Sequence, residues 1–97
     1  MIYHITDKDR WAAALKTGQY EAPSLLSEGF IHTSRKEQIA GVLKRYYSSN
    51  TDLLLLHIDE SRLTSPLRFE MAETVNEIFP HIYGPLNIDS VIKTESL

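Results

Sequence analysis

Cysteine is missing from the chain. Disulfide bonds, thiolate metal ligands and a cysteine nucleophile are therefore excluded, and packing alone holds the core together. The four glycines are isolated along the sequence, so no glycine-rich phosphate loop is present. The longest apolar run, Leu53 to Leu56, is far too short to span a bilayer, and no basic leader precedes the first predicted strand. These absences favour a cytoplasmic protein without a membrane partner.

A concentration of charge of one sign is also missing. Ten Lys and Arg and thirteen Asp and Glu are scattered along the chain and give a net charge of −3. Without a basic patch we expect no general nucleic-acid binding, although a few groups can still hold a nucleotide. The 97 residues, 42% hydrophobic and 24% charged, match one globular domain over residues 1–97. A chain of this size buries one core but no deep internal cavity, so any site should be a surface cleft.

The beginning of the chain predicts a strand followed by a short helix. Residues 2–5 are β-branched or aromatic, and their alternation puts two side chains on each face of a strand. The two pairs are Ile2 with His4 and Tyr3 with Ile5. Thr6 or Asp7 then fits a helix N-cap, and apolar residues recur at helical spacing until Gly18. Residues 19–27 have no clear period and predict a loop.

Residues 29–34, Gly-Phe-Ile-His-Thr-Ser, predict a strand that runs directly into a helix. The alternation places His32 and Thr33 on opposite faces, so only one of them should line a given cleft. Ser34 and Glu37 match a capping box, which would begin the helix. Side chains at a strand end and free N–H groups at a helix start point into the same space, and such junctions hold ligands in many proteins.

The second half of the chain predicts mainly strands. A helix over residues 39–46 is followed by four segments with strand character: residues 53–59, 67–70, 81–83 and 88–92. The first of these is a continuous apolar run, typical of a strand covered on both faces in the middle of a sheet. Residues 72–79 fit either a helical turn or a long loop. The order favours an α+β fold with two N-terminal helices packed on a mixed, mostly antiparallel sheet.

Three histidines are the main candidates for chemistry. His4, His32 and His81 lie in predicted strands beside hydroxyl or turn residues, whereas His57 lies in the most apolar strand and fits a structural role. Imidazole donates or accepts hydrogen bonds and changes charge near neutral pH, which suits proton transfer and metal binding. The spacing of these histidines matches no compact metal motif, so a metal site would require them to converge in the fold.

Other polar residues have competing explanations. Helix capping accounts for Ser34, and no nucleophile-elbow motif is present. Arg68 and Glu70 are two residues apart on a predicted strand and fit a surface ion pair of little energetic value. Tyr83, beside the turn residue Gly84, fits either ordinary packing or a stacking wall for a ligand ring.

Taken together, these motifs resemble a small bacterial family over essentially the whole chain. The two specific motifs are G-F-I-H-x-S at residues 29–34 and F-P-H-x-Y-G-P-L at residues 79–86. Further matching segments are Ile2-Tyr3-His4-Ile5-Thr6, Trp11, Gly18, Pro23-Ser24-Leu25, Gln38 and Arg68-Phe69-Glu70. On these residues the chain resembles the family named domain of unknown function 952.

The resemblance implies a fold grouped with ADP-ribosyltransferase-like proteins. In those transferases a first-strand histidine or arginine holds the nicotinamide ribose, a second motif supplies an aromatic or hydroxyl wall, and a third supplies a carboxylate. His4 matches the first motif, and His32 occupies the second where a tyrosine is common. The third motif falls near His81, where no carboxylate is found. The resemblance thus implies a divergent ADP-ribosyl- or phosphotransferase-like enzyme at most, with NAD as candidate cofactor and no metal.

The leading hypothesis is a cleft that binds a nucleotide-like ligand of the NAD or ADP-ribose type, or another phosphorylated small molecule. The candidate catalytic residues are His4, His32 and His81. The candidate binding residues are Thr6, Ser34, Glu70, Tyr83 and Gly84, with Tyr83 stacking on a ring and Glu70 as a reserve carboxylate. Two alternatives are a non-catalytic interaction module that keeps the fold and a histidine metal-binding protein. The sequence favours no oligomeric state.

Overall fold

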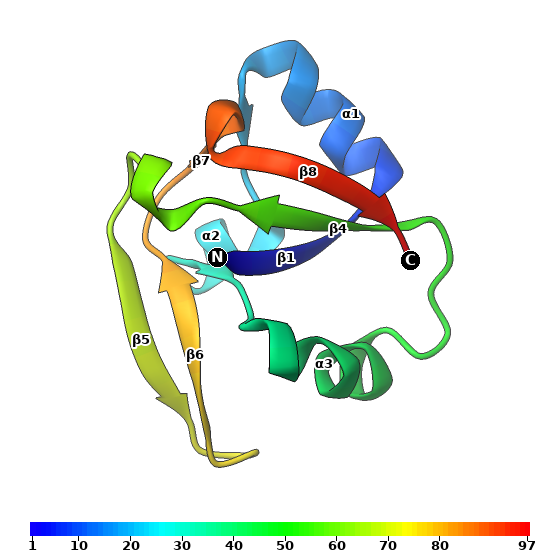
Figure 1. Ribbon diagram of the computed structural model, residues 1–97, viewed down its shortest axis with the longest axis vertical. Coiled ribbons are helices and arrows are strands. Elements are labelled where there is room, and N and C mark those ends of the chain that lie inside the picture. The colour runs from blue at the N-terminus through cyan, green and yellow to red at the C-terminus, as the bar shows by residue number, and fades with distance from the viewer.

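Three antiparallel sheets and three α-helices make up the computed structural model, which describes residues 1–97 (Figure 1). The strands are β1 (Ile2–Asp7), β2 (Gln19–Tyr20), β3 (Ile31–His32), β4 (Leu53–Ile58), β5 (Leu67–Ala72), β6 (Glu77–Ile82), β7 (Leu86–Asn87) and β8 (Val91–Ser96). The helices are α1 (Lys8–Thr17), α2 (Pro23–Ser27) and α3 (Ile39–Tyr46). Short 3-10 helices span Lys36–Gln38, Glu60–Arg62 and Ile88–Ser90. None of the helices is long and apolar enough to cross a membrane.

The sheet with order β1-β4-β8 forms the centre of the molecule, with α1 on one side and α3 on the other (Figure 1). On the α1 side, Leu56 packs in a core cluster that includes Trp11. On the α3 side, Leu55 belongs to a second cluster against which Val42 packs. Apolar burial on both faces drives this arrangement. The prediction that the apolar run is a central strand covered on both faces is confirmed.

The sheet with order β3-β6-β5 carries the long β5–β6 hairpin, which extends away from the central sheet (Figure 1). In this sheet β3 pairs with β6, so that His32 lies opposite His81. Of residues 72–79, which fitted either a helical turn or a loop, only 73–76 form the turn of this hairpin. The prediction is wrong for the rest, because Ala72 ends β5 and residues 77–79 begin β6. Asn76 adopts a φ of 53° in the turn, a left-handed conformation that asparagine tolerates better than most residues.

Several predicted elements differ from the structure. The helices are not both N-terminal, because α3 begins only at Ile39, and α2 is a third helix inside the predicted loop. Pro23 occupies its first turn, where the missing N–H costs nothing. The strands form three antiparallel sheets instead of one mixed sheet, with Tyr20 of β2 pairing with Leu86 of β7. The last strand begins later than predicted, at Val91, because a 3-10 turn precedes it.

The predicted capping box at Ser34 is also wrong. The N-cap of the helical segment is Arg35, whose backbone N–H donates to the side-chain oxygen of Gln38 at 2.9 Å. Ser34 instead pairs with β1, because its backbone N–H and C=O both bond to Tyr3. Two cap patterns, one residue apart, overlap in the sequence, and the pairing with β1 selects the second. The Ser34 hydroxyl is consequently not used as a cap.

Candidate functional site

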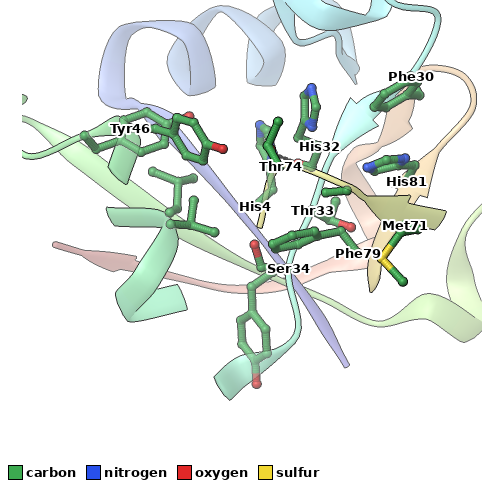
Figure 2. Close-up of a pocket in the computed structure, with 15 residues that line it drawn as sticks. His4, Phe30, His32, Thr33, Ser34, Tyr46, Met71, Thr74, Phe79 and His81 are labelled. Carbon is green, nitrogen blue, oxygen red and sulfur yellow. Dashed lines mark hydrogen bonds between the residues drawn. The ribbon is translucent and has the colours of Figure 1, made fainter. Parts of the chain in front are cut away.

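A groove lies between the β5–β6 hairpin and α3, with β1 and residues 30–34 at its base (Figure 2). Its volume is about 540 Å³, which is within the range of roughly 300–1,000 Å³ typical of small-molecule sites. His4, His32 and His81 all line it. The structure therefore brings the three candidate histidines to one surface hollow, although their roles remain predictions.

We name this hollow the aromatic groove because of its lining. Its aromatic side chains, besides the histidines, are Tyr3, Phe30, Tyr46, Tyr47 and Phe79. No Lys, Arg, Asp or Glu side chain lines it. A groove with aromatic walls and no fixed charge suits a flat, largely apolar ligand with a few polar atoms.

His4 is held by hydrogen bonds at both ring nitrogens. Its Nδ1 bonds to the backbone carbonyl of His32, and its Nε2 lies 2.7 Å from the Tyr20 hydroxyl. Burial lowers the pKa of His4 to about 4, so the ring is neutral at pH 7. A carbonyl only accepts, so Nδ1 carries the proton and Nε2 must accept a hydrogen bond.

The state of His4 fixes the direction of a short hydrogen-bond chain. Because Nε2 of His4 accepts, the Tyr20 hydroxyl donates to it. The hydroxyl oxygens of Tyr20 and Thr6 lie 2.9 Å apart, and the Thr6 hydroxyl then donates to Tyr20. Burial raises the pKa of Tyr20 to about 12, which keeps its proton in place. Every polar atom in this chain has a partner, so His4 lines the groove mainly as a fixed wall.

His81 is held on one side only. Its Nδ1 lies 2.8 Å from Oε1 of Glu70, and the Tyr83 hydroxyl donates to the same oxygen. The hydrogen bonds from Tyr83 and His81 hold the pKa of Glu70 below its usual range, and the bond to Glu70 raises the pKa of Tyr83. A neutral His81 donates from Nδ1 to this carboxylate, and its Nε2 has no partner within the chain.

The free nitrogen of His81 faces the groove. No buried side-chain nitrogen or oxygen in the protein is without a hydrogen-bond partner, so Nε2 of His81 must have access to solvent. His81 lines the aromatic groove, which is where that access lies. A carboxylate-oriented imidazole of this kind can accept a hydrogen bond or a proton from a bound molecule.

Phe30 and His32 complete this end of the groove (Figure 2). The rings of Phe30 and His81 stack with centroids 4.0 Å apart and planes 18° from parallel. His32 stands edge-on to His81, at 5.4 Å between centroids. The outer nitrogen of His32, Nε2, lies 2.9 Å from a carboxylate oxygen of the exposed Glu28. The stack fixes the plane of His81, and His32 lies at the rim.

A second hollow of about 330 Å³ adjoins the aromatic groove, and we name it the polar cavity. The two hollows share four lining residues: His4, Ile5, His32 and Tyr47. The side chains of the polar cavity with hydroxyl or amide groups are Thr6, Tyr20, Ser24, Tyr47, Asn50 and Thr51. Its Arg10 is paired with Asp7 at 2.7 Å. The polar cavity thus offers many hydrogen-bonding groups and no excess of positive charge.

Two hydroxyls of the central segment behave differently from expectation. Thr33 and His32 both line the groove, although strand alternation placed them on opposite faces. β3 is only two residues long, so the alternation ends before Thr33. The Thr33 hydroxyl donates to the carbonyl of Pro80, whereas the Ser34 hydroxyl forms no hydrogen bond within the chain and lines the groove.

The other candidate binding residues lie outside the aromatic groove. Thr6 lines the polar cavity, and Glu70 and Tyr83 support His81 without lining the groove. The predicted Arg68–Glu70 surface pair does not form, because Glu70 bonds to His81 and the Arg68 guanidinium lies over the ring of Tyr83 at 5.0 Å. Gly84 packs against Ser65, and a side chain there would collide with it.

A histidine metal centre has no support in this arrangement. No group of three or more His, Asp or Glu side chains comes together in a way that could hold a metal ion. The nitrogens of His4 are both occupied by protein groups, and His32 and His81 each bond to a carboxylate of their own.

Sequence reasoning missed three residues that shape the site. Tyr20 lay in a segment predicted as a loop, and no local pattern marks it as the partner of His4. Phe79 lay in the segment that fitted helix or loop. Phe30 had a usable signal, because strand alternation placed it on the same face as His32, and its ring indeed packs near that of His32 at 4.9 Å.

Comparison with known proteins shows the family. The family model described as "Protein of unknown function (DUF952)" matches residues 5–94. The chain belongs to the DUF952 family. No curated protein matches this DUF952 chain.

Solved structures of one relative share the fold of this DUF952 protein. The crystal structure of protein CC0527 from Caulobacter crescentus is 31% identical in sequence, with a TM-score of 0.89, and the match covers 99% of this chain and 84% of that one. The solution NMR structure of the same protein gives a TM-score of 0.84 at 31% identity, covering 99% and 83%. Neither structure is described as that of an ADP-ribosyltransferase, so that grouping stays a prediction.

Proposed function

We propose that the aromatic groove and the polar cavity form one site for a nucleoside-like molecule, meaning a flat heteroaromatic ring joined to a group rich in hydroxyls. One observation carries the proposal: two adjoining hollows of opposite character share four lining residues. The aromatic groove takes the ring, and the polar cavity takes the hydroxylated part. This keeps the nucleotide-like ligand expected from the sequence and narrows it to the uncharged members of that class.

The polar atoms at the two ends match such a ligand. In the aromatic groove, Nε2 of His81 accepts a hydrogen bond from a ring N–H, and Phe30 supports the stack. In the polar cavity, hydroxyl and amide groups such as those of Thr51 and Asn50 bond to ligand hydroxyls. Each good hydrogen bond contributes about 1 kcal/mol, and the stacking area adds to it.

The distribution of charge argues for nucleosides over phosphorylated ligands. The only cationic side chain that lines either hollow is Arg10, which is already paired with Asp7. A phosphate would have to compete with that carboxylate for the guanidinium. NAD and ADP-ribose, the ligands that family resemblance suggests, are therefore expected to bind more weakly than a nucleoside.

Calorimetry tests the proposal directly. We expect at least one of adenosine, guanosine, cytidine and uridine to bind with a Kd below the millimolar range, corresponding to more than about 4 kcal/mol. NAD and ADP-ribose should bind more weakly than the best nucleoside. The proposal is wrong if the folded protein gives no heat with any of the four nucleosides.

A pair of exposed helical positions provides a matched control. Tyr46 lines the aromatic groove and is 62% exposed, whereas Leu15 on α1 is 56% exposed and lines neither hollow. Tyr46→Lys removes an aromatic wall and adds a charge to the groove, so it should weaken nucleoside binding. Leu15→Lys should leave binding unchanged. Equal affinities for the two variants would contradict the assignment of the groove.

A further inference from the structure

Strand β5 has an open edge. It pairs with β6 on one side, and its other side has no neighbouring strand (Figure 1). An open edge presents a row of free N–H and C=O groups that can pair with another chain. The backbone groups, exposed apolar side chains and charges along this edge all fit a second copy of the same chain.

Pro80 shows which backbone groups of β5 point outward. The carbonyl of Pro80 accepts the N–H of Thr33, so the backbone of Pro80 is directed toward β3 and away from β5. Phe69 lies opposite Pro80 in the register of the hairpin. In an antiparallel pair the directions alternate, so the N–H and C=O of Phe69 point to the free edge, as do those of Leu67 and Met71.

Three six-residue strands lie at sheet edges: β1, β5 and β8. The outer side of β1 is partly covered, because Tyr3 pairs with Ser34. The other two, β5 and β8, are protected to different degrees. On β8, Lys93 lies in the edge and the pairing with β4 is interrupted between His57 and Ile58. Charged residues, prolines and irregular pairing are the usual devices that stop edge strands from associating. On β5 the pairing with β6 is continuous from Leu67 to Ala72, and the strand has neither lysine nor proline. Its two charged residues, Arg68 and Glu70, are opposite in sign.

One face of the β5–β6 hairpin is apolar and exposed. Phe69 is 53% exposed, Met71 is 51% exposed, and Ile78, which lies opposite Met71, is 43% exposed. These three side chains lie on the same face, because alternate residues and directly opposed residues share a face in a sheet. An exposed apolar cluster beside an open edge marks an association surface.

The other face of β5 carries one positive and one negative side chain, Arg68 and Glu70, which can pair with the same two residues of a second copy. Arg68 forms no ion pair within the chain, and Oε2 of Glu70 forms no hydrogen bond there. If two copies of β5 pair antiparallel about a twofold axis at Phe69, Arg68 lies opposite the partner's Glu70. By symmetry, Glu70 lies opposite the partner's Arg68, which gives a second, equivalent ion pair. The same register places Leu67 opposite the partner's Met71. This isologous arrangement is the commonest kind of protein dimer.

We propose that the protein forms a homodimer in which β5 pairs antiparallel with the β5 strand of a second copy, centred on Phe69. The outward N–H and C=O groups of Leu67, Phe69 and Met71 form the hydrogen bonds between the chains. The apolar faces of the two hairpins lie side by side, so that each covers part of the other's exposed side chains. On the opposite face, Arg68 pairs with the partner's Glu70. Each β3-β6-β5 sheet thereby becomes half of a continuous six-stranded sheet.

Because the chain has no cysteine, a single introduced cysteine tests the register. The twofold axis brings the two copies of residue 69 to about 5.5 Å between Cα atoms, within the range that a disulfide spans. Under mild oxidation, most of a Phe69→Cys variant should become a disulfide-linked dimer. Ile92→Cys is the matched control, since Ile92 is 50% exposed on the edge strand β8, and it should cross-link far less.

Analytical ultracentrifugation tests the dimer without a covalent cross-link. At about 100 µM, a concentration well above a micromolar Kd, the wild-type chain should sediment as a dimer. Phe69→Lys should be a folded monomer, and Ile92→Lys should remain a dimer. A monomeric wild-type protein, or equal cross-linking of the two cysteine variants, would overturn the proposal.

Discussion

His4 and His81 have the same exposure, 7% in each case, yet they differ in what their nitrogens do. Both nitrogens of His4 bond to protein groups, the carbonyl of His32 and the hydroxyl of Tyr20. One nitrogen of His81 bonds to Glu70, and the other faces the aromatic groove without a partner in the chain. Burial therefore does not distinguish a structural histidine from a functional one, whereas the hydrogen-bond partners of the two ring nitrogens do.

The difference assigns unequal roles to two residues that the sequence treats alike. His4 links β1 to β2 and to the central segment, so its loss should mainly affect stability. His81 is oriented by a carboxylate and presents an acceptor to the groove, so its loss should mainly affect binding. Substitution of one or the other tests this division directly.

The largest expected effect is that of His4→Phe at pH 7. Phenylalanine keeps a ring but leaves the His32 carbonyl without its donor and removes one of the two partners of the Tyr20 hydroxyl, at about 1–3 kcal/mol for each lost partner. The larger ring adds packing strain. We expect the free energy of unfolding, measured with urea, to fall by about 4 kcal/mol. The comparison fails if His4→Phe costs no more than the same change at His81.

Acidification should produce the next largest effect. The pKa of His4 is about 4 in the folded protein against 6.5 for an ordinary histidine. The unfolded state therefore binds more protons in this window, so this contribution to stability is fully present above pH 6.5 and is lost as the pH falls toward 4. The difference of 2.5 pH units corresponds to about 3 kcal/mol at most.

Unfolding free energies measured between pH 7 and pH 4 check this slope. The variant His4→Gln cannot titrate at this position, and its amide can still bond to both the His32 carbonyl and Tyr20. Its stability should change less across the same window. If wild type and His4→Gln show the same pH dependence, His4 is not the group responsible.

Tyr20→Phe should have a smaller effect, about 2 kcal/mol. It removes the hydroxyl between Nε2 of His4 and Thr6, so a buried acceptor loses its partner while the packing is kept. Tyr47→Phe is the control, because the Tyr47 hydroxyl forms no hydrogen bond within the chain and its loss should cost little. Urea unfolding of both variants measures the difference, and equal costs would show that the His4–Tyr20 bond contributes nothing.

His81→Phe should have the smallest effect on stability, less than about 1 kcal/mol. The ring still stacks on Phe30, and the carboxylate of Glu70 keeps its bond from Tyr83. Nucleoside binding, in contrast, should weaken by about tenfold or more, since a ligand N–H loses its acceptor. Unfolding and calorimetry on one preparation measure both quantities. A large loss of stability with unchanged binding would reverse the roles of His81 and His4.

Local patterns predicted the main strands because each carries its own signal. The apolar run of β4 and the alternation in β1 both follow from side-chain periodicity, and the structure confirms them. The short elements failed. β2 has two residues and α2 has five, too few to show a period, and both depend on tertiary contacts such as those of Tyr20.

The same limit applies to the candidate site. Periodicity placed His32 on the same face as Phe30, and the two rings do pack together, but it could not show that Glu70 bonds to His81 or that Tyr20 bonds to His4. The Ser34 cap failed for a related reason. Ser34 pairs with β1, a tertiary contact that the S-x-x-E pattern does not record, and the helical segment is capped one residue later, at Arg35.

The sequence by itself determined the α+β class, the central strand, the family motifs and the choice of three candidate histidines. Those features depend on residue type and on periods of two or 3.6 residues, which are local properties. Only the tertiary structure decided which histidine is fixed and which is free. Hydrogen-bond partners 11 and 16 residues away along the chain set that difference, and no local pattern records them.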